Sequence, residues 1–247
     1  MKFRMNSPQG KAILALVRGG DYAHPGEEAV LARVAQALPR EAVHRLLDVG
    51  CGRGGTADWF VRHGWGTVVG VDIDGESIEY ARHRYGGVTF AQSDVLALPQ
   101  LQQEPFDLAY LFNSFYAFSD QPAALTSLRK VCRCGACLLI FDYTKPPDRA
   151  LPEVLGTEIG QPIVLESIAA QMTAANWQLS SVEDWTESYL KAYSHFLARV
   201  RTNQSAIVAL AGEDWYAYVE QWYGFLWQSL ESGDLGGAVL IARAAER

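Results

Sequence analysis

The chain has 247 residues, of which 49% are hydrophobic and 20% are charged, and its formal net charge is −7. This length suits one large α/β domain with a sizeable core. The acidic balance, without any cluster of lysine and arginine, argues against nucleic acid and anionic membrane surfaces as partners, because both bind to basic patches. The apolar runs are all shorter than the ~20 residues that span a bilayer.

The N-terminal segment predicts a short helix. Its apolar patch, residues 12–17, is short and lacks a convincing cleavage site for a secretory signal. Ser7 is placed to cap this helix, and Pro8 suits its first position. Gly19 and Gly20 are expected to end it.

From residue 44 the chain alternates short apolar runs with amphipathic stretches, which is typical of βαβ units and a parallel sheet. Asp120 is a candidate N-cap, Gly135 is expected to lie where a helix stops, and Asp107 is expected to be a turn residue. The expected strands are residues 44–49, 67–72, 88–92, 106–112 and 136–143. The expected helices are residues 26–38, 56–63, 76–85 and 122–132.

The pattern changes after Tyr143. A proline-rich stretch predicts a loop. The elements expected after it are a helix over 163–176, a strand over 177–184, helices over 187–211 and 213–230, and a last strand over 238–244. About 50 residues of helix between two late strands are too many for a simple connection, so we expect a lid.

The stretch DVGCGRGG, Asp48 to Gly55, follows the first predicted strand and precedes a helix. Its glycines permit backbone angles that other residues avoid and leave room for a ligand to touch the main chain. The free N–H groups of the following helix attract negative charge. The carboxyl edge of a parallel sheet is also where such folds bind ligands.

Two further acids end the next two strands. Asp72 closes TVVGVD, where a carboxylate accepts hydrogen bonds from the two hydroxyls of a ribose. Asp94 follows the third strand in SDV and can accept from the exocyclic amine of adenine. Together with the glycine turn, these positions predict an adenosine ligand with a charged tail.

Asp48 discriminates between two such ligands. It stands before the glycines, where the pyrophosphate of NAD would be repelled, whereas the ammonium and sulfonium of S-adenosylmethionine would be attracted. A dinucleotide-dependent oxidoreductase therefore remains as an alternative that Asp48 disfavours.

The sequence resembles the class I S-adenosylmethionine-dependent methyltransferases of the small-molecule kind, including the sarcosine/dimethylglycine and phosphoethanolamine methyltransferase group. The motifs that carry the resemblance are LLDVGCGRGG, VVGVDID, FAQSDVLALP and FDLAYLFNSFYAF. The segment LRKVCRCGACLLIFDY resembles the family around its fifth strand, with Cys134 where proline is usual.

The resemblance implies an α/β fold with a doubly wound, mostly parallel sheet of seven strands, the last strand antiparallel, and a helical lid inserted before it. One methyltransferase domain would occupy residues 1–247. Within it, residues 1–40 would form an N-terminal helical cover, residues 41–184 and 236–247 a Rossmann-like core, and residues 185–235 the lid.

The resemblance also implies the contacts to S-adenosylmethionine and its product S-adenosylhomocysteine. The methionine part would lie against the turn after the first strand and the end of the fourth, the ribose at Asp72 and the adenine at Asp94. The residues implied are Asp48, Gly50, Cys51, Gly52, Asp72, Ile73, Asp94, Val95, Asn113 and Ser114.

Candidate catalytic residues are Tyr22, His24 and Tyr116. Tyr22 and His24 lie in GGDYAHPGEE, a segment that folds over the cofactor in similar enzymes, and Tyr116 follows the fourth strand. His24 is either a general base or a cap or surface residue, and both interpretations stay open. Because the sulfonium is a good leaving group, positioning and exclusion of water can supply most of the rate, and a base is optional.

The predicted lid is rich in aromatic residues. Trp215, Tyr218, Trp222 and Phe225 recur at helical spacing, which predicts that most of them are core residues. Others would wall a pocket for a cationic amine or an apolar natural product. The few basic residues, chiefly Lys191, Arg199 and Arg201, make a phosphorylated substrate less obvious.

The cysteines do not have the spacing of a metal site. CRCGAC places Cys132, Cys134 and Cys137 in the pattern CxCxxC, whereas zinc sites favour CxxC pairs. We expect no metal, reduced thiols and a cytoplasmic location.

The sequence thus predicts an enzyme that transfers a methyl group from S-adenosylmethionine to a nitrogen or oxygen of a small molecule. The alternatives are a catalytically silent adenosyl-binding protein, an NAD-dependent oxidoreductase, and a methyltransferase for protein or RNA. The sequence leaves monomer and homodimer open.

Overall fold

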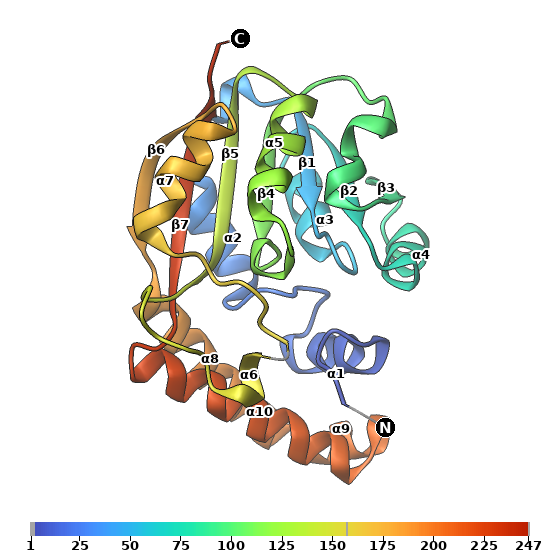
Figure 1. Ribbon diagram of the computed structural model, residues 1–247. Helices are drawn as coiled ribbons and strands as arrows, with labels where there is room; N and C mark the ends of the chain where they lie inside the picture. Colours follow the sequence, from blue (N-terminus) through green and yellow to red (C-terminus); the bar gives the residue numbers. More distant parts are fainter. Residues whose placement is uncertain (1–2, 157, 247) are drawn as a thin grey trace.

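The computed structural model describes residues 3–156 and 158–246, and seven strands form one sheet in the order β3-β2-β1-β4-β5-β7-β6 (Figure 1). β7 runs antiparallel to β5 and β6, and the remaining pairs are parallel. This topology confirms the predicted fold class. The strands are β1 (Arg45–Val49), β2 (Thr67–Asp72), β3 (Thr89–Gln92), β4 (Phe106–Phe112), β5 (Cys132–Thr144), β6 (Trp177–Asp184) and β7 (Gly236–Ala244).

The helices begin and end close to where the sequence places their caps. The Ser7 hydroxyl accepts from the N–H of Gly10 at 3.2 Å, Gly19 ends the first helix with φ +70°, and Asp120 accepts from the N–H of Ala123 at 2.9 Å. The α-helices are α1 (Pro8–Arg18), α2 (Glu27–Ala35), α3 (Gly55–Arg62), α4 (Gly75–Arg84), α5 (Gln121–Val131), α6 (Glu153–Gly156), α7 (Leu165–Ala174), α8 (Thr186–Thr202), α9 (Gln204–Ala211) and α10 (Glu213–Glu231). Three 3₁₀ turns are η1 (Arg40–Ala42), η2 (Val95–Leu101) and η3 (Phe115–Ala117).

The alternation of side chains along the strands divides the core into two. On β4, Tyr110 and Phe112 face a cluster that includes residues of α1, α2, α3, α8 and α10. Ala109 and Leu111 face the other cluster, with residues of α5 and α7. Each face of the sheet is therefore covered by helices, as a mostly parallel sheet requires.

The late helices gather at one edge of the sheet. Figure 1 shows α8, α9 and α10, together with α1 and α6, below the end of the sheet from which β5 leaves toward α6. That end is the carboxyl edge of the parallel strands, where the predicted ligand residues lie. Helices α8 to α10 thus stand where a lid would cover a ligand.

Three local expectations are wrong. Cys132 to Gly135 belongs to β5 and not to a helix end, and Gly135 has φ +75° inside that strand. The expected helix over 187–211 breaks at Asn203 into α8 and α9. Asp107 lies within β4, buried, and not in a turn.

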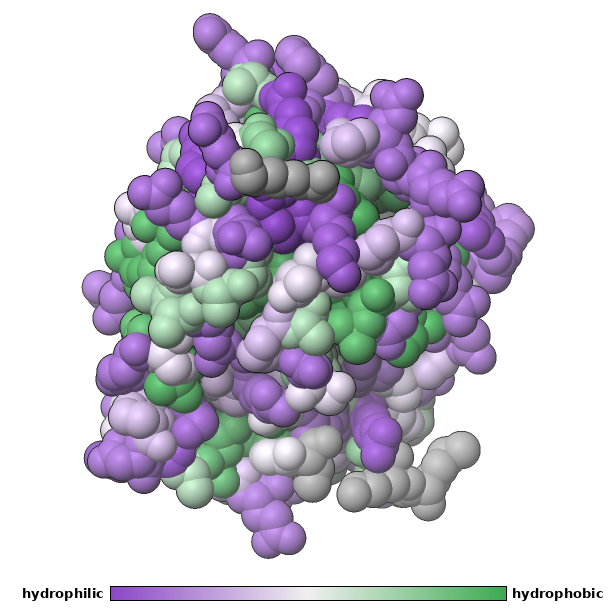
Figure 2. Space-filling view, turned by 45° about the horizontal axis from the view of Figure 1, so that its top comes forward, coloured by the Kyte–Doolittle hydropathy of each residue, from purple (hydrophilic) through white to green (hydrophobic). Residues whose placement is uncertain are grey.

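Hydrophilic and hydrophobic residues are interspersed over the face that Figure 2 presents. In the part of the chain that the structure describes, every helix is too short or too polar to cross a bilayer.

Asp107 ties the start of β1 to β4, which generates a stability prediction. Its Oδ2 accepts from the N–H groups of His44 and Arg45 at 2.8 and 2.9 Å, and its Oδ1 lies 2.7 Å from Nε of Arg133. Asp107→Ala leaves two N–H groups without their acceptor, so we expect a loss of about 2 kcal/mol in unfolding free energy, measured by urea denaturation. Glu104→Ala, at an exposed position nearby, is the control and should change stability by less than about 0.5 kcal/mol. Equal stability of the two variants would contradict the assignment.

Candidate functional site

A cavity of about 320 Å³ opens at the carboxyl ends of β1 to β5, beside the point where the strand order reverses between β1 and β4. Open α/β sheets bind ligands at this crevice. Nine of the residues predicted from the sequence line the cavity: Gly50, Gly52, Asp72, Ile73, Asp94, Val95, Asn113, Ser114 and Tyr116.

The turn between β1 and α3 is fixed by its neighbours on both sides. The N–H of Gly50 donates to the carbonyl of Val71 at 2.8 Å, and the hydroxyl of Ser114 donates to the carbonyl of Val49 at 2.6 Å. Gly50 has φ +74°, and a Cβ there would lie 2.4 Å from Cβ of Ser114. Gly52 lines the cavity, and a Cβ there would meet no protein atom within 4 Å, so bare main chain is open to a ligand.

Asp72 holds two turns with one carboxylate. Its Oδ2 accepts from the N–H of Gly52 at 2.7 Å, and its Oδ1 accepts from the N–H of Asp74 at 2.9 Å. Asp74 caps α4 by accepting from the N–H of Glu76 at 3.2 Å, so Asp72 is not needed as the cap of this helix. A carboxylate has about four acceptor positions, so Asp72 retains capacity toward the cavity it lines.

Two exposed apolar side chains line the cavity together with Asp94. Ile73 is 67% exposed and Leu96 is 49% exposed, and both line the cavity. Asp94 lies with them and caps η2 by accepting from the N–H of Leu96 at 2.8 Å. Apolar walls with one acceptor between them suit a flat base such as adenine.

Asn113 presents a free donor at the end of β4. It adopts φ +51°, a left-handed conformation that asparagine tolerates better than most residues. Its Oδ1 accepts from the Tyr189 hydroxyl at 3.1 Å, whereas its buried Nδ2 has no hydrogen-bond partner among the described residues. An orphaned donor in a cavity wall is expected where a ligand supplies the acceptor.

Asp48 and Cys51 lie behind the lining and do not form part of it. Asp48 is 2% exposed, and its Oδ2 has no hydrogen-bond partner in the described part of the chain. Burial, reinforced by the charge of Asp72, raises the pKa of Asp48 well above its ordinary value. Burial also raises the pKa of the Cys51 thiol. The side chain of Asp48 on β1 is thus buried behind the cavity lining, which residue spacing alone did not reveal.

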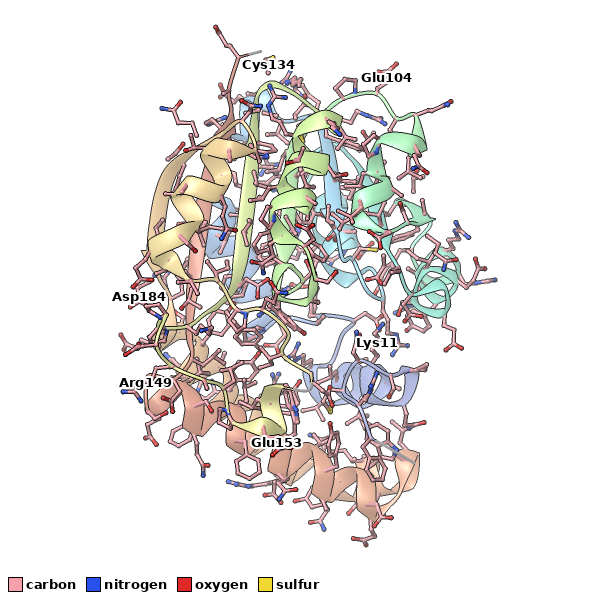
Figure 3. The ribbon with its side chains drawn as sticks, in the orientation of Figure 1. Lys11, Glu104, Cys134, Arg149, Glu153 and Asp184 are labelled. Carbon is pink, nitrogen blue, oxygen red and sulfur yellow. The ribbon has the colours of Figure 1, made fainter. Side chains whose placement is uncertain are left out.

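Lys11 is a lining residue that the sequence analysis missed. Its Nζ lies 2.5 Å from Oδ2 of Asp74 and donates to the Ser77 hydroxyl at 2.8 Å. Figure 3 shows its position between α1 and the carboxyl edge of the sheet. Its place on an amphipathic helix carried no functional signal, because only the packing of α1 against this edge brings it to the site.

Arg53, in the glycine turn, is held by neighbouring side chains. Its Nε lies 3.2 Å from Oδ1 of Asp21, and its guanidinium lies over the ring of Tyr80 at 3.6 Å. It is not a lining residue of the cavity.

Tyr22 and His24 are adjacent to the cavity but turned away from it. Between them Ala23 lines the cavity, so its two neighbours project elsewhere. The Tyr22 hydroxyl donates to Oε1 of Glu28 at 2.6 Å, and His24 is 1% exposed. Burial, then the charge of Arg18, lowers the pKa of His24 to about 3. His24 therefore has neither the exposure of a surface residue nor a place in the lining of the cavity.

The end of the cavity away from Asp94 is walled by aromatic residues. Tyr116 and Tyr143 have ring centroids 5.3 Å apart, the Tyr143 and Tyr193 hydroxyls are hydrogen-bonded, and Tyr193 and Tyr223 lie 5.7 Å apart. We refer to Tyr116, Tyr143, Tyr193, Trp222 and Tyr223 as the aromatic end. Its members come from η3, β5, α8 and α10.

The tyrosines of the aromatic end are neutral at physiological pH. Burial raises the pKa of Tyr116 far above its usual range and that of Tyr223 to about 12. Tyr116, a predicted catalytic residue, therefore faces the cavity as a neutral phenol that can donate or accept a hydrogen bond, and not as a phenolate base.

Glu158 adds a carboxylate to this end and was also missed. It lines the cavity from the loop after α6, accepts from the Tyr218 hydroxyl through Oε1, and accepts from the N–H of Met5 through Oε2 at 2.8 Å. It joins three segments that are distant in sequence, so no local pattern marked it.

The cysteines of CRCGAC, unlike Cys51, lie away from the site. Figure 3 shows Cys134 at the end of the sheet opposite Lys11. Among the described residues, no group of three or more cysteine, histidine or acidic side chains is arranged to hold a metal ion.

Comparisons with known proteins agree with this geometry. Residues 46–135 match a protein family described as a methyltransferase domain. Phosphoethanolamine N-methyltransferase 1 of Zea mays is 28% identical over 192 residues, which are 75% of this chain and 35% of that protein. The chain thus spans about a third of the length of that relative.

Two solved structures are similar over nearly the whole chain. A putative sarcosine dimethylglycine methyltransferase from Galdieria sulphuraria has a TM-score of 0.86 at 15% identity, covering 99% of this chain and 100% of that one. A Haemonchus contortus phosphoethanolamine N-methyltransferase 2, in complex with phosphomonomethylethanolamine and S-adenosylhomocysteine, has a TM-score of 0.86 at 18% identity, covering 98% and 58%. The predicted resemblance and the fold are confirmed.

The burial of His24 predicts a pH effect on stability. The unfolded histidine binds a proton below about pH 6.5, whereas the folded one does so only near pH 3. Its contribution is therefore fully present above pH 6.5 and is lost as the pH falls toward 3. His24→Phe keeps a ring against Phe112 and Phe141, which lie 5.0 and 6.2 Å from it.

We expect the wild type to lose about 2 kcal/mol more unfolding free energy than His24→Phe between pH 6.5 and 4.5. Urea titrations at a series of pH values measure the difference, in which groups common to both proteins cancel. Parallel pH dependences would show that His24 is not held neutral by folding.

Proposed function

We propose that this chain, which carries the methyltransferase domain of class I S-adenosylmethionine-dependent enzymes, transfers a methyl group to a nitrogen or oxygen of a small molecule. The observation that carries the proposal is the convergence of Gly52, Asp72 and Asp94 on one cavity at the strand-order reversal. Because the chain spans about a third of its curated relative, activity and substrate are inferred from the site.

The lining residues suit an adenosyl ligand. Asp72 is assigned to the ribose hydroxyls, and Ile73, Leu96 and Asp94 to the adenine. Gly50, Gly52 and Ser114 are assigned to the methionine part, where the orphaned amide of Asn113 offers a donor to its carboxylate.

Charge complementarity favours S-adenosylmethionine over a dinucleotide. Asp72 lies near the glycine turn, and Asp48 lies behind it. Asp48 is 2% exposed, and its Oδ2 has no hydrogen-bond partner in the described part of the chain. A cationic ligand part nearby favours the ionised form of Asp48, whereas a pyrophosphate, itself an anion, offers this buried carboxyl no such compensation. When bound, S-adenosylmethionine supplies an electrophilic methyl group.

The chain's own contribution is to bind, orient and exclude water. Tyr116, Tyr143 and Tyr193 are neutral phenols that can hold a polar group of the acceptor in one orientation. Helices α8 and α10 supply Tyr193, Trp222 and Tyr223 as a cover over the same cavity. Positioning of this kind can account for most of the rate of methyl transfer.

The domain organisation and setting complete the proposal. We assign residues 1–40 as the N-terminal cover, 41–184 and 236–247 as the core, and 185–235 as the lid. The four cysteines form no disulfide in the described part of the chain, and reduced thiols support a cytoplasmic location.

Asp72→Ala tests the assignment of the cofactor. The substitution removes the acceptor of the ribose hydroxyls and the support of the Gly52 turn, so we expect affinity for S-adenosylhomocysteine to fall roughly 100-fold, measured by calorimetry. Glu104→Ala, an exposed acid at the opposite end of the sheet in Figure 3, should leave affinity unchanged. Undiminished affinity of a folded Asp72→Ala protein would remove the ribose assignment.

A further inference from the structure

The charges around the cavity divide unequally between its two ends. Lys11 is the one cationic side chain among the described lining residues, and its ammonium is engaged by Asp74 at the end of β2. Among the described residues the other charged side chains that line the cavity are acidic, and Glu158 is the one bonded to Tyr218 of α10; the acids are Asp72, Asp94, Asp120 and Glu158. An acceptor bound at the aromatic end thus meets a carboxylate and aromatic rings.

Arg18 and Arg4, whose charges act on tyrosines near this end, are not lining residues of the cavity. Arg18 is 6% exposed, donates to the carbonyl of Tyr22 at 2.8 Å, and has its Nε 3.7 Å from Oε1 of Glu27. Arg4 is exposed and lies outside the lining residues. Neither side chain is placed to receive a phosphate or carboxylate inside the cavity.

Glu158 has acceptor capacity left for a ligand. Each of its oxygens accepts one hydrogen bond, from the Tyr218 hydroxyl and from the N–H of Met5. Both oxygens therefore keep a free lone-pair position. Carboxylates and aromatic faces together form the environment that recognises an ammonium group.

We infer that Glu158 is a specificity-determining residue, which selects an acceptor with a protonated amine at the aromatic end and rejects acceptors with a phosphate or carboxylate there. The inference rests on the proposed function and concerns binding. It distinguishes this chain from the two similar proteins whose names specify phosphoethanolamine and dimethylglycine, compounds that bear such anionic groups.

The test compares matched pairs of compounds that differ by one anionic group, bound to protein saturated with S-adenosylhomocysteine. The pairs are ethanolamine with phosphoethanolamine, tyramine with tyrosine, and N,N-dimethylethylamine with N,N-dimethylglycine. We expect at least one amine to bind, and each amine that binds to do so at least 10-fold more tightly than its anionic partner, by calorimetry.

Three variants separate charge from structure. Glu158→Gln keeps the shape and one of the two acceptor oxygens but removes the charge, so the preference should fall to within about threefold. Glu153→Gln, on the exposed face of α6, should keep the preference. Tyr218→Phe removes one donor to Glu158 without altering its charge and should also keep it.

Several results would overturn the inference. They are tighter binding of an anionic partner to the wild type, an unchanged preference in Glu158→Gln, an equal loss in Tyr218→Phe, or failure of all three amines to bind. Failure of S-adenosylhomocysteine itself to bind would instead remove the proposed function and this inference with it.

Discussion

The site depends on one carboxylate that organises two turns at the carboxyl edge of the sheet. Asp72 accepts the N–H of Gly52 on one oxygen and the N–H of Asp74 on the other. The first bond fixes the glycine turn against β2, and the second sets the start of α4, whose cap Asp74 in turn engages Lys11. The hydrogen-bonding capacity that remains on Asp72 faces the cavity, so the group that orders the backbone is also available to a ligand.

The charged and polar groups that surround the cavity differ between its two ends. Acidic residues surround the adenosyl end, and the acid nearest the glycine turn, Asp48, is buried without a partner for one oxygen. Such a group is costly unless a cation or a proton compensates it. At the other end, neutral tyrosines and Glu158 present donors, acceptors and ring faces. A cationic cofactor and an acceptor that carries no anion both match this field.

The sequence predicted the parts of the site that follow from strand ends. β2 and β4 begin and end at the predicted residues, so the ligand positions at their carboxyl ends, among them Asp72 and Asn113, were placed correctly at the cavity edge. When the end of a parallel strand is known, the residue that follows it must lie at the carboxyl edge of the sheet.

What the sequence could not place depends on tertiary packing. Tyr22 and His24 lie in an irregular segment, where periodicity does not decide which side chain faces the cavity, and Ala23 faces it instead. Lys11 and Glu158 reach the site only because α1 and the loop after α6 fold across the same edge. Gly135 was expected where a helix stops, but it lies inside a strand with φ +75°.

The most direct test of the account is a side-by-side calorimetric titration of the wild-type protein with S-adenosylmethionine, S-adenosylhomocysteine and NAD. We predict that the two adenosyl-amino-acid ligands bind and that NAD gives no signal, because a pyrophosphate cannot compensate the buried carboxyl of Asp48 as a cation can. Binding of NAD alone would contradict the assignments of Asp48 and Asp94 and, with them, the proposed reaction.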